Sequence, residues 1–241
     1  MADTFPPTLY ILGTDQGINR LDPQTGKVEP VQISALVLSM LEDRAGNFWL
    51  GTAVGLYHYD RQSGELLVYV NDPQNPASLS SNGVSALRED TLGNLWVGTM
   101  NGGLNRFDPQ EGKFYRYQHD PDDPDSLSDN GVISIYPASD GTLWIGTAGG
   151  LNRFNPASGE FRSFREADGL PNDYIYGILE DTQGRLWLST NRGLSRFDPD
   201  GGRFRNFDAQ DGLQSNEFNQ GAHCKLKNGE LLFGGINGFT R

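Results

Sequence analysis

The chain has 241 residues, of which 36% are hydrophobic and 11% aromatic, and 31 are glycines. Its formal net charge of −12 opposes binding to the phosphates of nucleic acids or to anionic membrane surfaces, because like charges repel. The single cysteine, Cys224, excludes an intramolecular disulfide and zinc sites built from several thiolates. Because of the net negative charge, we expect no nucleic-acid partner. No apolar run approaches the roughly 20 residues that span a bilayer, so we also expect no membrane insertion by this chain.

A motif containing Gly, Trp and Gly-Thr recurs at intervals of about 45 residues. It reads GNFWLGTAVGLYHYD at 46–60, GNLWVGTMNGGLNRFD at 93–108, GTLWIGTAGGLNRFN at 141–155 and GRLWLSTNRGLSRFD at 184–198, with weaker copies at 9–22 and 229–241. We therefore treat residues 1–241 as a single domain. Its repeat units cover approximately 9–34, 35–82, 83–130, 131–173, 174–217 and 218–241.

Each complete unit predicts four short strands. In the third unit these are an apolar run at 84–90, the Trp strand at 94–99, a third strand at 104–108 and a fourth at 113–117, separated by Gly-containing turns. Four antiparallel strands per repeat of this length are typical of a β-propeller blade. The first unit lacks the first strand and the last stops after the third. The prediction is an all-β propeller of about six four-stranded blades with incomplete end blades, in a ring that is open or closed by its end units.

One tryptophan stands at the same position of four units. Because a unique ligand site would not repeat, these rings are interpreted as the packed core between blades: Trp49, Trp96, Trp144 and Trp187. His223 departs from its own column, which is otherwise aliphatic. We interpret it as a packed core histidine, with a functional role as the alternative.

Recognisable catalytic motifs are absent from the sequence. It contains no G-x-S-x-G, no H-E-x-x-H, no phosphate-binding loop and no G-x-G-x-x-G. The acidic linker at 120–125 lacks the D-x-D-x-D-G spacing of a calcium loop. We therefore expect no enzyme, no cofactor and no metal site. A glycan hydrolase or lyase remains a less favoured alternative, because carboxylates are abundant.

In a propeller, the connections between blades and the turns between the second and third strands lie on one face, where ligands commonly bind. Amide and carboxylate groups bind sugar hydroxyls, and an aromatic ring stacks on a sugar face. The candidate ligand-binding residues are Asp15, Asn101, Asp173, Tyr174, Asn191, Arg192, Glu217, Asn219 and Asn237. The alternative interpretation of these residues is an ordinary solvated loop surface.

Three stretches of the chain carry a family resemblance: EDTLGNLWVGTMNGGLNRFD at 89–108, the linkers at 71–84 and 119–132, and the segment at 211–239. They resemble the two-component regulator propeller repeat, found in the sensor regions of membrane histidine kinases. The resemblance implies a non-catalytic sensor of a carbohydrate or small polar ligand, in the periplasm or outside the cell. Residues 1–7 show no signal-peptide pattern, so this location rests on the resemblance alone. The alternative is a protein-interaction or self-assembling scaffold that associates through its incomplete end blades.

Overall fold

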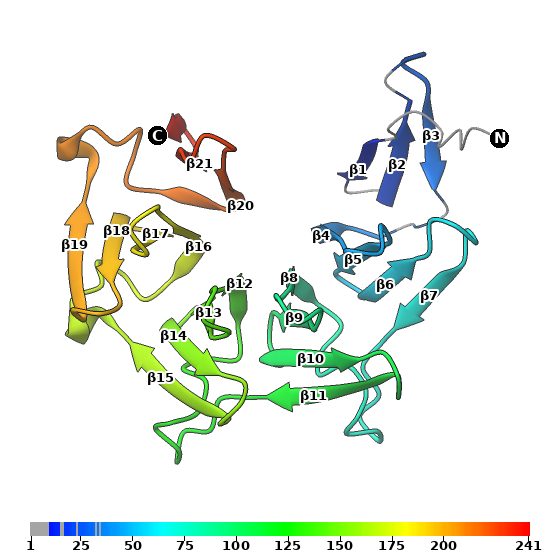
Figure 1. Cartoon of the computed structure of the whole chain (residues 1–241), viewed down its shortest axis with the longest axis horizontal. Coiled ribbons are helices and arrows are strands. Elements are labelled where there is room, and N and C mark those ends of the chain that lie inside the picture. Colours follow the sequence, from blue (N-terminus) through cyan, green and yellow to red (C-terminus); the bar gives the residue numbers. More distant parts are fainter. Residues whose placement is uncertain (1–9, 15–16, 23, 32, 34) are drawn as a thin grey trace.

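The computed structural model describes residues 10–241 except 15–16, 23, 32 and 34, and the predicted site residue Asp15 lies outside the described residues. The described strands form six antiparallel sheets that follow one another around a central axis (Figure 1). Within each sheet the strands pair in chain order, as neighbouring hairpins.

The first three sheets contain eleven strands. The first holds β1 (Tyr10–Thr14), β2 (Gly17–Leu21) and β3 (Val28–Val31). The second holds β4 (Val37–Glu42), β5 (Phe48–Thr52), β6 (Gly55–Tyr59) and β7 (Leu66–Tyr69). The third holds β8 (Val84–Glu89), β9 (Leu95–Thr99), β10 (Leu104–Asp108) and β11 (Lys113–Tyr117).

The remaining strands form the other three sheets, with two short 3₁₀ turns between them. The fourth sheet holds β12 (Val132–Pro137), β13 (Leu143–Thr147), β14 (Gly150–Asn155) and β15 (Glu160–Phe164). After η1 (Glu166–Asp168), the fifth holds β16 (Ile175–Glu180), β17 (Leu186–Thr190), β18 (Gly193–Asp198) and β19 (Arg203–Phe207). After η2 (Ala209–Asp211), the sixth holds β20 (Phe218–Lys225), β21 (Leu231–Gly235) and β22 (Gly238–Thr240).

The strands β4, β8, β12, β16 and β20 line the inner edge of the arc, and each packs against the next. The first sheet starts at the second strand of the repeat and has no inner strand among its described residues. The prediction of an all-β propeller with incomplete end units is thus confirmed. In Figure 1 the arc is open between the sheets β20–β22 and β1–β3.

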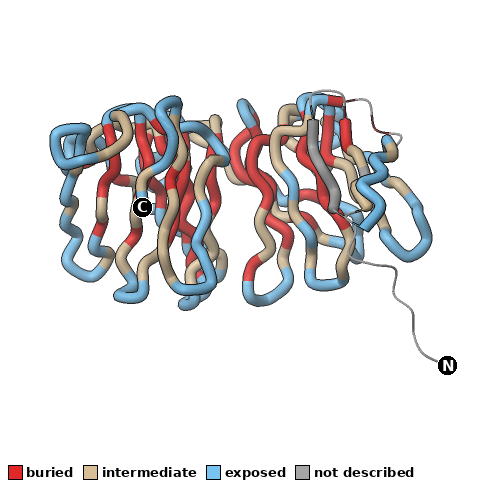
Figure 2. The backbone as a smooth tube through the Cα atoms, turned by 90° about the horizontal axis from the view of Figure 1, so that it is seen from above, coloured by how far each residue is buried: buried red, intermediate tan, exposed pale blue. Residues whose placement is uncertain are grey.

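The tryptophans lie between neighbouring sheets, where the core is concentrated. Trp96 is fully buried, with its ring centroid 6.0 Å from that of Tyr117 in its own sheet and 5.8 Å from that of Phe154 in the next. Trp49 and Trp144 are buried in equivalent surroundings. Figure 2 shows buried residues along the middle of the strands and exposed ones at the two rims. The side chains available to a ligand therefore lie at the rims and at the inner edge.

An aspartate ties the first turn of several repeats to the tryptophan. In the third sheet, Trp96 Nε1 donates to Asp90 Oδ2 at 2.8 Å, and the amides of Leu92 and Asn94 donate to Asp90 Oδ1 at 2.9 Å. Burial raises the pKa of Asp90, but the hydrogen bonds outweigh it and hold that pKa below its usual value. The turn and the core ring are thereby fixed to each other.

Candidate functional site

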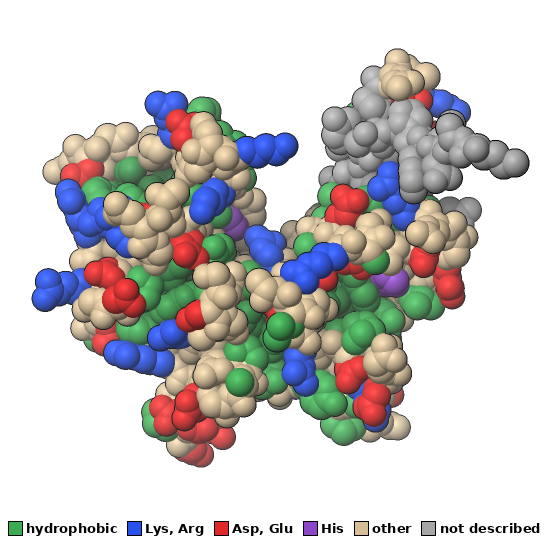
Figure 3. Space-filling view, in the orientation of Figure 1, with side chains coloured by type: hydrophobic (Ala, Val, Ile, Leu, Met, Phe, Trp, Pro, Cys, Tyr) green, Lys and Arg blue, Asp and Glu red, His purple; other side chains and the backbone are tan. Residues whose placement is uncertain are grey.

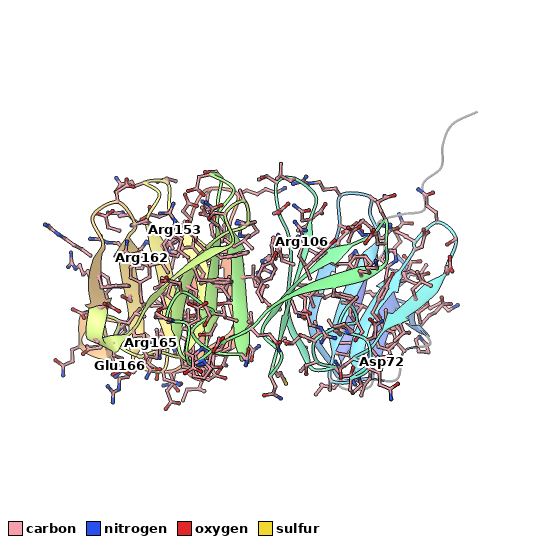
Figure 4. The ribbon with its side chains drawn as sticks, turned by 90° about the horizontal axis from the view of Figure 1, so that it is seen from below. Asp72, Arg106, Arg153, Arg162, Arg165 and Glu166 are labelled. Atoms are coloured by element: carbon pink, nitrogen blue, oxygen red, sulfur yellow. The ribbon has the colours of Figure 1, made fainter. Side chains whose placement is uncertain are left out.

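The connections between sheets and the turns between second and third strands lie on one rim of the arc. Backbone hydrogen bonds join the two kinds of loop; Gly193 N, for example, donates to Asn216 O at 2.7 Å. Figure 4 shows Asp72, Arg165 and Glu166, which come from two such connections, at this same rim. We call this rim the loop face.

The described candidate residues all belong to the loop face or to its edge. Asn101 lies in the β9–β10 turn, Asn191 and Arg192 in the β17–β18 turn, and Asn237 in the β21–β22 turn. Asp173 and Tyr174 lie in the β15–β16 connection, Glu217 in the β19–β20 connection and Asn219 in β20. Asn101 stands two sheets away from the β17–β18 turn, so the structure does not bring it to the others.

The β15–β16 connection folds around a short 3₁₀ turn. Arg165 N donates to Asp168 Oδ2 at 2.8 Å, and Gly169 ends the turn at a φ of 116°, a conformation that favours glycine. Glu166 N donates to Asp173 Oδ1 at 2.6 Å. This candidate carboxylate therefore holds its own loop in shape, and only its second oxygen remains for a ligand.

Two tyrosines and an amide form a compact group beside this connection. The ring centroids of Tyr174 and Tyr176 are 4.9 Å apart, with 53° between the planes. Tyr176 Oη donates to Asn191 Oδ1 at 2.9 Å. Partial burial raises the pKa of Tyr174, and the nearby Tyr176 and Asp129 raise it further. The Tyr174 hydroxyl is therefore a protonated donor at neutral pH. Both rings are half-buried, and their remaining surface faces solvent.

A polar pair extends the group outward. Arg192 Nη1 lies 3.9 Å from Glu166 Oε2, and both side chains are largely exposed. Asn172 Nδ2 donates to Glu166 Oε1 at 3.2 Å. An exposed ion pair at this distance contributes little to stability, so the guanidinium is free to turn toward a ligand at small cost.

A second group lies on the last sheet. Gln214 Oε1 accepts from Asn237 N at 2.9 Å, while Gln214 Nε2 donates to Glu217 O at 3.0 Å. Gln214 thus joins two candidate residues. Neither Gln214 nor Glu166 belongs to the set predicted from the sequence. The repeat alignment gave no signal for either, because both lie in connections that differ from unit to unit.

An open cavity of about 410 Å³ lies beside Arg192, between the β15–β16 and β19–β20 connections. Its lining residues are Pro171, Arg192, Asn206, Phe207, Asp208, Asp211 and Asn216. Most of these residues are polar or charged. The volume of the cavity lies within the roughly 300–1,000 Å³ usual for small-ligand sites. The loop face therefore offers one stacking surface, several amides and charges of both signs.

Among the described residues, no three His, Cys, Asp or Glu side chains gather closely enough to hold a metal ion. In the same part of the chain, no helix is long and apolar enough to cross a bilayer.

These sheets and their loop face define a β-propeller built from repeats, with polar side chains on the loops. The family model described as Two component regulator propeller matches residues 126–149 and 169–192, which confirms the resemblance drawn from the sequence. A second model, described as SMP-30/Gluconolactonase/LRE-like region, matches residues 11–134, more than half of the chain. The chain belongs to this second family and carries two-component regulator propeller repeats. No match was found among curated proteins.

Solved structures give the same picture of the fold. The extracellular domain of a putative hybrid two component system from B. thetaiotaomicron is 28% identical, with a TM-score of 0.82 over 95% of this chain. This chain spans 31% of that structure. Virginiamycin B lyase from Staphylococcus aureus is 20% identical, with a TM-score of 0.68 over 93% of this chain and 76% of the lyase. A gluconolactonase from Xanthomonas campestris is 16% identical, with a TM-score of 0.62 over 93% of this chain and 77% of that one. The last two likenesses concern the fold alone.

Proposed function

We propose that this chain is a non-catalytic sensor propeller of a two-component receptor, placed in the periplasm or outside the cell. Its ligand is a carbohydrate or small polar molecule bound at the loop face. The observation that carries the proposal is the group formed by Tyr174, Tyr176 and Asn191 beside the exposed charge of Arg192. The likeness to the extracellular domain of a putative hybrid two component system supports the sensor role.

The chemistry of this group suits a sugar ring. A partly exposed tyrosine offers an apolar face for stacking and a hydroxyl for hydrogen bonding. Asn191 uses its carbonyl oxygen to hold Tyr176, which leaves its amide N–H groups as donors for a ligand. Asp173 and Glu166 add acceptors next to it. A ligand rich in hydroxyls would pair with these donors and acceptors at once.

Two of the three described histidines are held in structural contacts, which favours a binding role over catalysis. His119 Nδ1 lies 2.7 Å from Leu127 O, and His58 stacks on Trp49 with ring centroids 4.2 Å apart. Both rings are engaged in holding structure. The match of residues 11–134 to the SMP-30/Gluconolactonase/LRE-like family model supports the enzymatic alternative, which predicts product formation from a glycan or lactone. Mass spectrometry of oligosaccharides and lactones after incubation with the protein would reveal such products.

The test of the proposal is a thermal-shift screen against oligosaccharides, followed by calorimetric titration of every positive compound. A ligand at 100 times its dissociation constant should stabilise the native state by about 2.7 kcal/mol. We expect Tyr174→Ala and Asn191→Ala to weaken binding at least tenfold. The matched control is Tyr115→Ala, which removes an exposed tyrosine from β11, remote from the loop face. A panel that shifts nothing, or binding that survives both variants, would refute the proposal.

A second candidate function is self-association through the last sheet. The edge strand β22 and the turn before it expose two large side chains, Ile236 at 66% and Phe239 at 67%. Exposed apolar edges favour pairing with another strand. On this hypothesis the mass in solution rises with protein concentration, and Phe239→Lys returns it to that of one chain. A constant single-chain mass at all concentrations would exclude it.

A further inference from the structure

A separate cavity of about 220 Å³ lies at the inner edge of the arc, between residues of β4, β8, β12 and β20. Its polar lining consists of Arg88, His223, Gln220, Ser39, Ser85 and Ser134, and no acidic side chain is found among its described lining residues. Figure 3 shows basic side chains at this inner edge. The chain as a whole carries a net charge of −12, whereas the lining of this cavity is basic.

Arg88 is the principal charge of the cavity, and little in the described chain neutralises it. Its Nη1 donates to Leu87 O at 2.8 Å. The guanidinium has five N–H donors, and Arg88 forms no ion pair with any described residue. Burial lowers the pKa of Arg88. A largely buried cation without a counter-charge is costly, and an anion beside it removes that cost.

His223 lies next to this charge. Its Nδ1 is buried and has no hydrogen-bond partner among the described residues. The ring fits because Gly177 has no side chain: a Cβ there would lie 2.5 Å from Nδ1. Burial, and after it the charge of Arg88, lower the pKa of His223 to about 4. At neutral pH the imidazole is therefore uncharged, and Arg88 alone supplies the positive charge.

The repeat itself sets these two residues apart. At the position of Arg88 the other inner strands carry Leu41, Tyr136, Leu179 and Cys224. At the position of His223 they carry Met40, Leu87, Ile135 and Ile178. Propeller packing thus places no arginine or histidine there in the other units, so stacking of the blades does not account for either residue.

We propose that this cavity binds a small oxyanion, the carboxylate, sulfate or phosphate group of a ligand, through the guanidinium of Arg88 with His223 and Gln220 beside it. The volume lies below the roughly 300–1,000 Å³ of most small-ligand pockets, so it admits one such group and not an oligosaccharide. Arginine suits the task because its planar fork forms two parallel hydrogen bonds to an oxyanion. The inference does not rest on the proposed sugar site at the loop face.

The three histidines of the chain provide an internal test. Histidine-ring NMR signals are recorded while sodium sulfate, sodium phosphate or sodium galacturonate replaces sodium chloride at constant ionic strength. His223→Gln assigns the His223 signal. We expect that signal to move saturably with millimolar oxyanion, while those of His58 and His119 stay in place. No saturable movement, or equal movement of all three signals, would overturn the proposal.

Arginine variants then locate the charge. We expect Arg88→Gln to weaken the oxyanion at least tenfold. The matched control Arg106→Gln removes one charge from the same sheet, where Arg106 lies over the Tyr115 ring at 4.8 Å, and should bind like the unaltered protein. An Arg88→Gln protein that folds and binds normally would refute the assignment.

Where circular dichroism shows that Arg88→Gln is unfolded, Arg88→Lys replaces it. Lysine keeps the charge but loses the fork, so we expect folded protein with weakened binding; undiminished affinity would overturn the proposal. The three salts identify the source of the group. A response to galacturonate alone indicates a sugar acid, and a response to sulfate or phosphate indicates recognition of the inorganic group. Either response supports an oxyanion site at Arg88.

Discussion

The third and fifth sheets carry the same tryptophan motif, yet their tryptophans have different surroundings. Trp96 is fully buried, because Phe154 of the next sheet contacts it edge-on. Trp187 is half-buried; it stacks on Phe207 of its own sheet, with centroids 5.4 Å apart. The sixth sheet leaves a cavity of about 500 Å³ over it.

This difference shows that burial of the repeated ring depends on the following sheet. In the third, fourth and fifth sheets, a phenylalanine in the third strand reaches back to the preceding tryptophan: Phe107, Phe154 and Phe197. The sixth sheet contributes Leu231 and Phe233 to the cavity lining, and its third strand β22 ends at Thr240. The motif therefore places the tryptophan ring in each sheet. Packing of the following sheet against the ring determines how much the ring contributes to the free energy of unfolding.

The largest expected effect is the loss of stability when each of the two tryptophans is replaced by alanine. Trp96→Ala should lower the free energy of unfolding by about 3–5 kcal/mol, the usual range for a fully buried aromatic residue. Trp187→Ala should cost about half as much, because water already reaches the ring. Urea unfolding of the two variants measures both values. Equal losses would show that the open cavity in the last interface has no energetic consequence.

The last interface should also be the acid-sensitive one, because His223 replaces an aliphatic residue there. Its pKa of about 4 lies below the usual 6.5, so the unfolded chain binds more protons between these values. The free energy of unfolding is therefore highest above pH 6.5. It falls by up to about 3 kcal/mol as the pH drops toward 4.

Urea unfolding at pH 7.5, 5.5 and 4.5 tests this. We expect His223→Leu to flatten the pH dependence, while the control His119→Gln retains it. A steep dependence that persists without His223 would assign it to other groups.

The aspartates that accept hydrogen bonds from the two tryptophans should show the same order of losses in the free energy of unfolding. Asp90→Ala should cost about 2 kcal/mol, because it leaves the buried Trp96 N–H without an acceptor. Asp181→Ala should cost about 1 kcal/mol, since the half-buried Trp187 can donate to water instead. Thermal and urea unfolding of both variants compare them. A reversed order would contradict the link between neighbour packing and turn stability.

The smallest effect is expected at the edge of the last sheet. Phe239 occupies the position of Leu151 and Leu194, which are buried in complete sheets. Phe239→Lys should change the free energy of unfolding by less than about 0.5 kcal/mol. Leu151→Lys should prevent folding or cost several kcal/mol, because it buries a charge. Similar effects of the two variants would show that the edge of the last sheet is covered in solution.

The repeat made the strands and their order predictable, since Trp96 and its counterparts mark one strand in each unit. The repeat could not predict the contacts within the loop face. Asp173 is a predicted ligand residue, yet one of its oxygens accepts a hydrogen bond from Glu166 N. Nor could it pair Arg88 with His223, because the curvature of the arc brings β8 and β20 to one cavity. The departure of His223 from its column was visible in the sequence, and the same comparison would have found Arg88.

The inner strands β4, β8, β12 and β16 each contain one extra residue that pairs with no partner in the second strand of the sheet. Their side chains are two aliphatic groups, one hydroxyl and one aromatic ring: Leu38, Ile133, Ser85 and Tyr176. Register is held by the paired residues on either side, so an exchange at these positions leaves the sheet in place. The bulge therefore gives each of these four sheets one side chain at the inner edge that can be exchanged without a change in strand pairing.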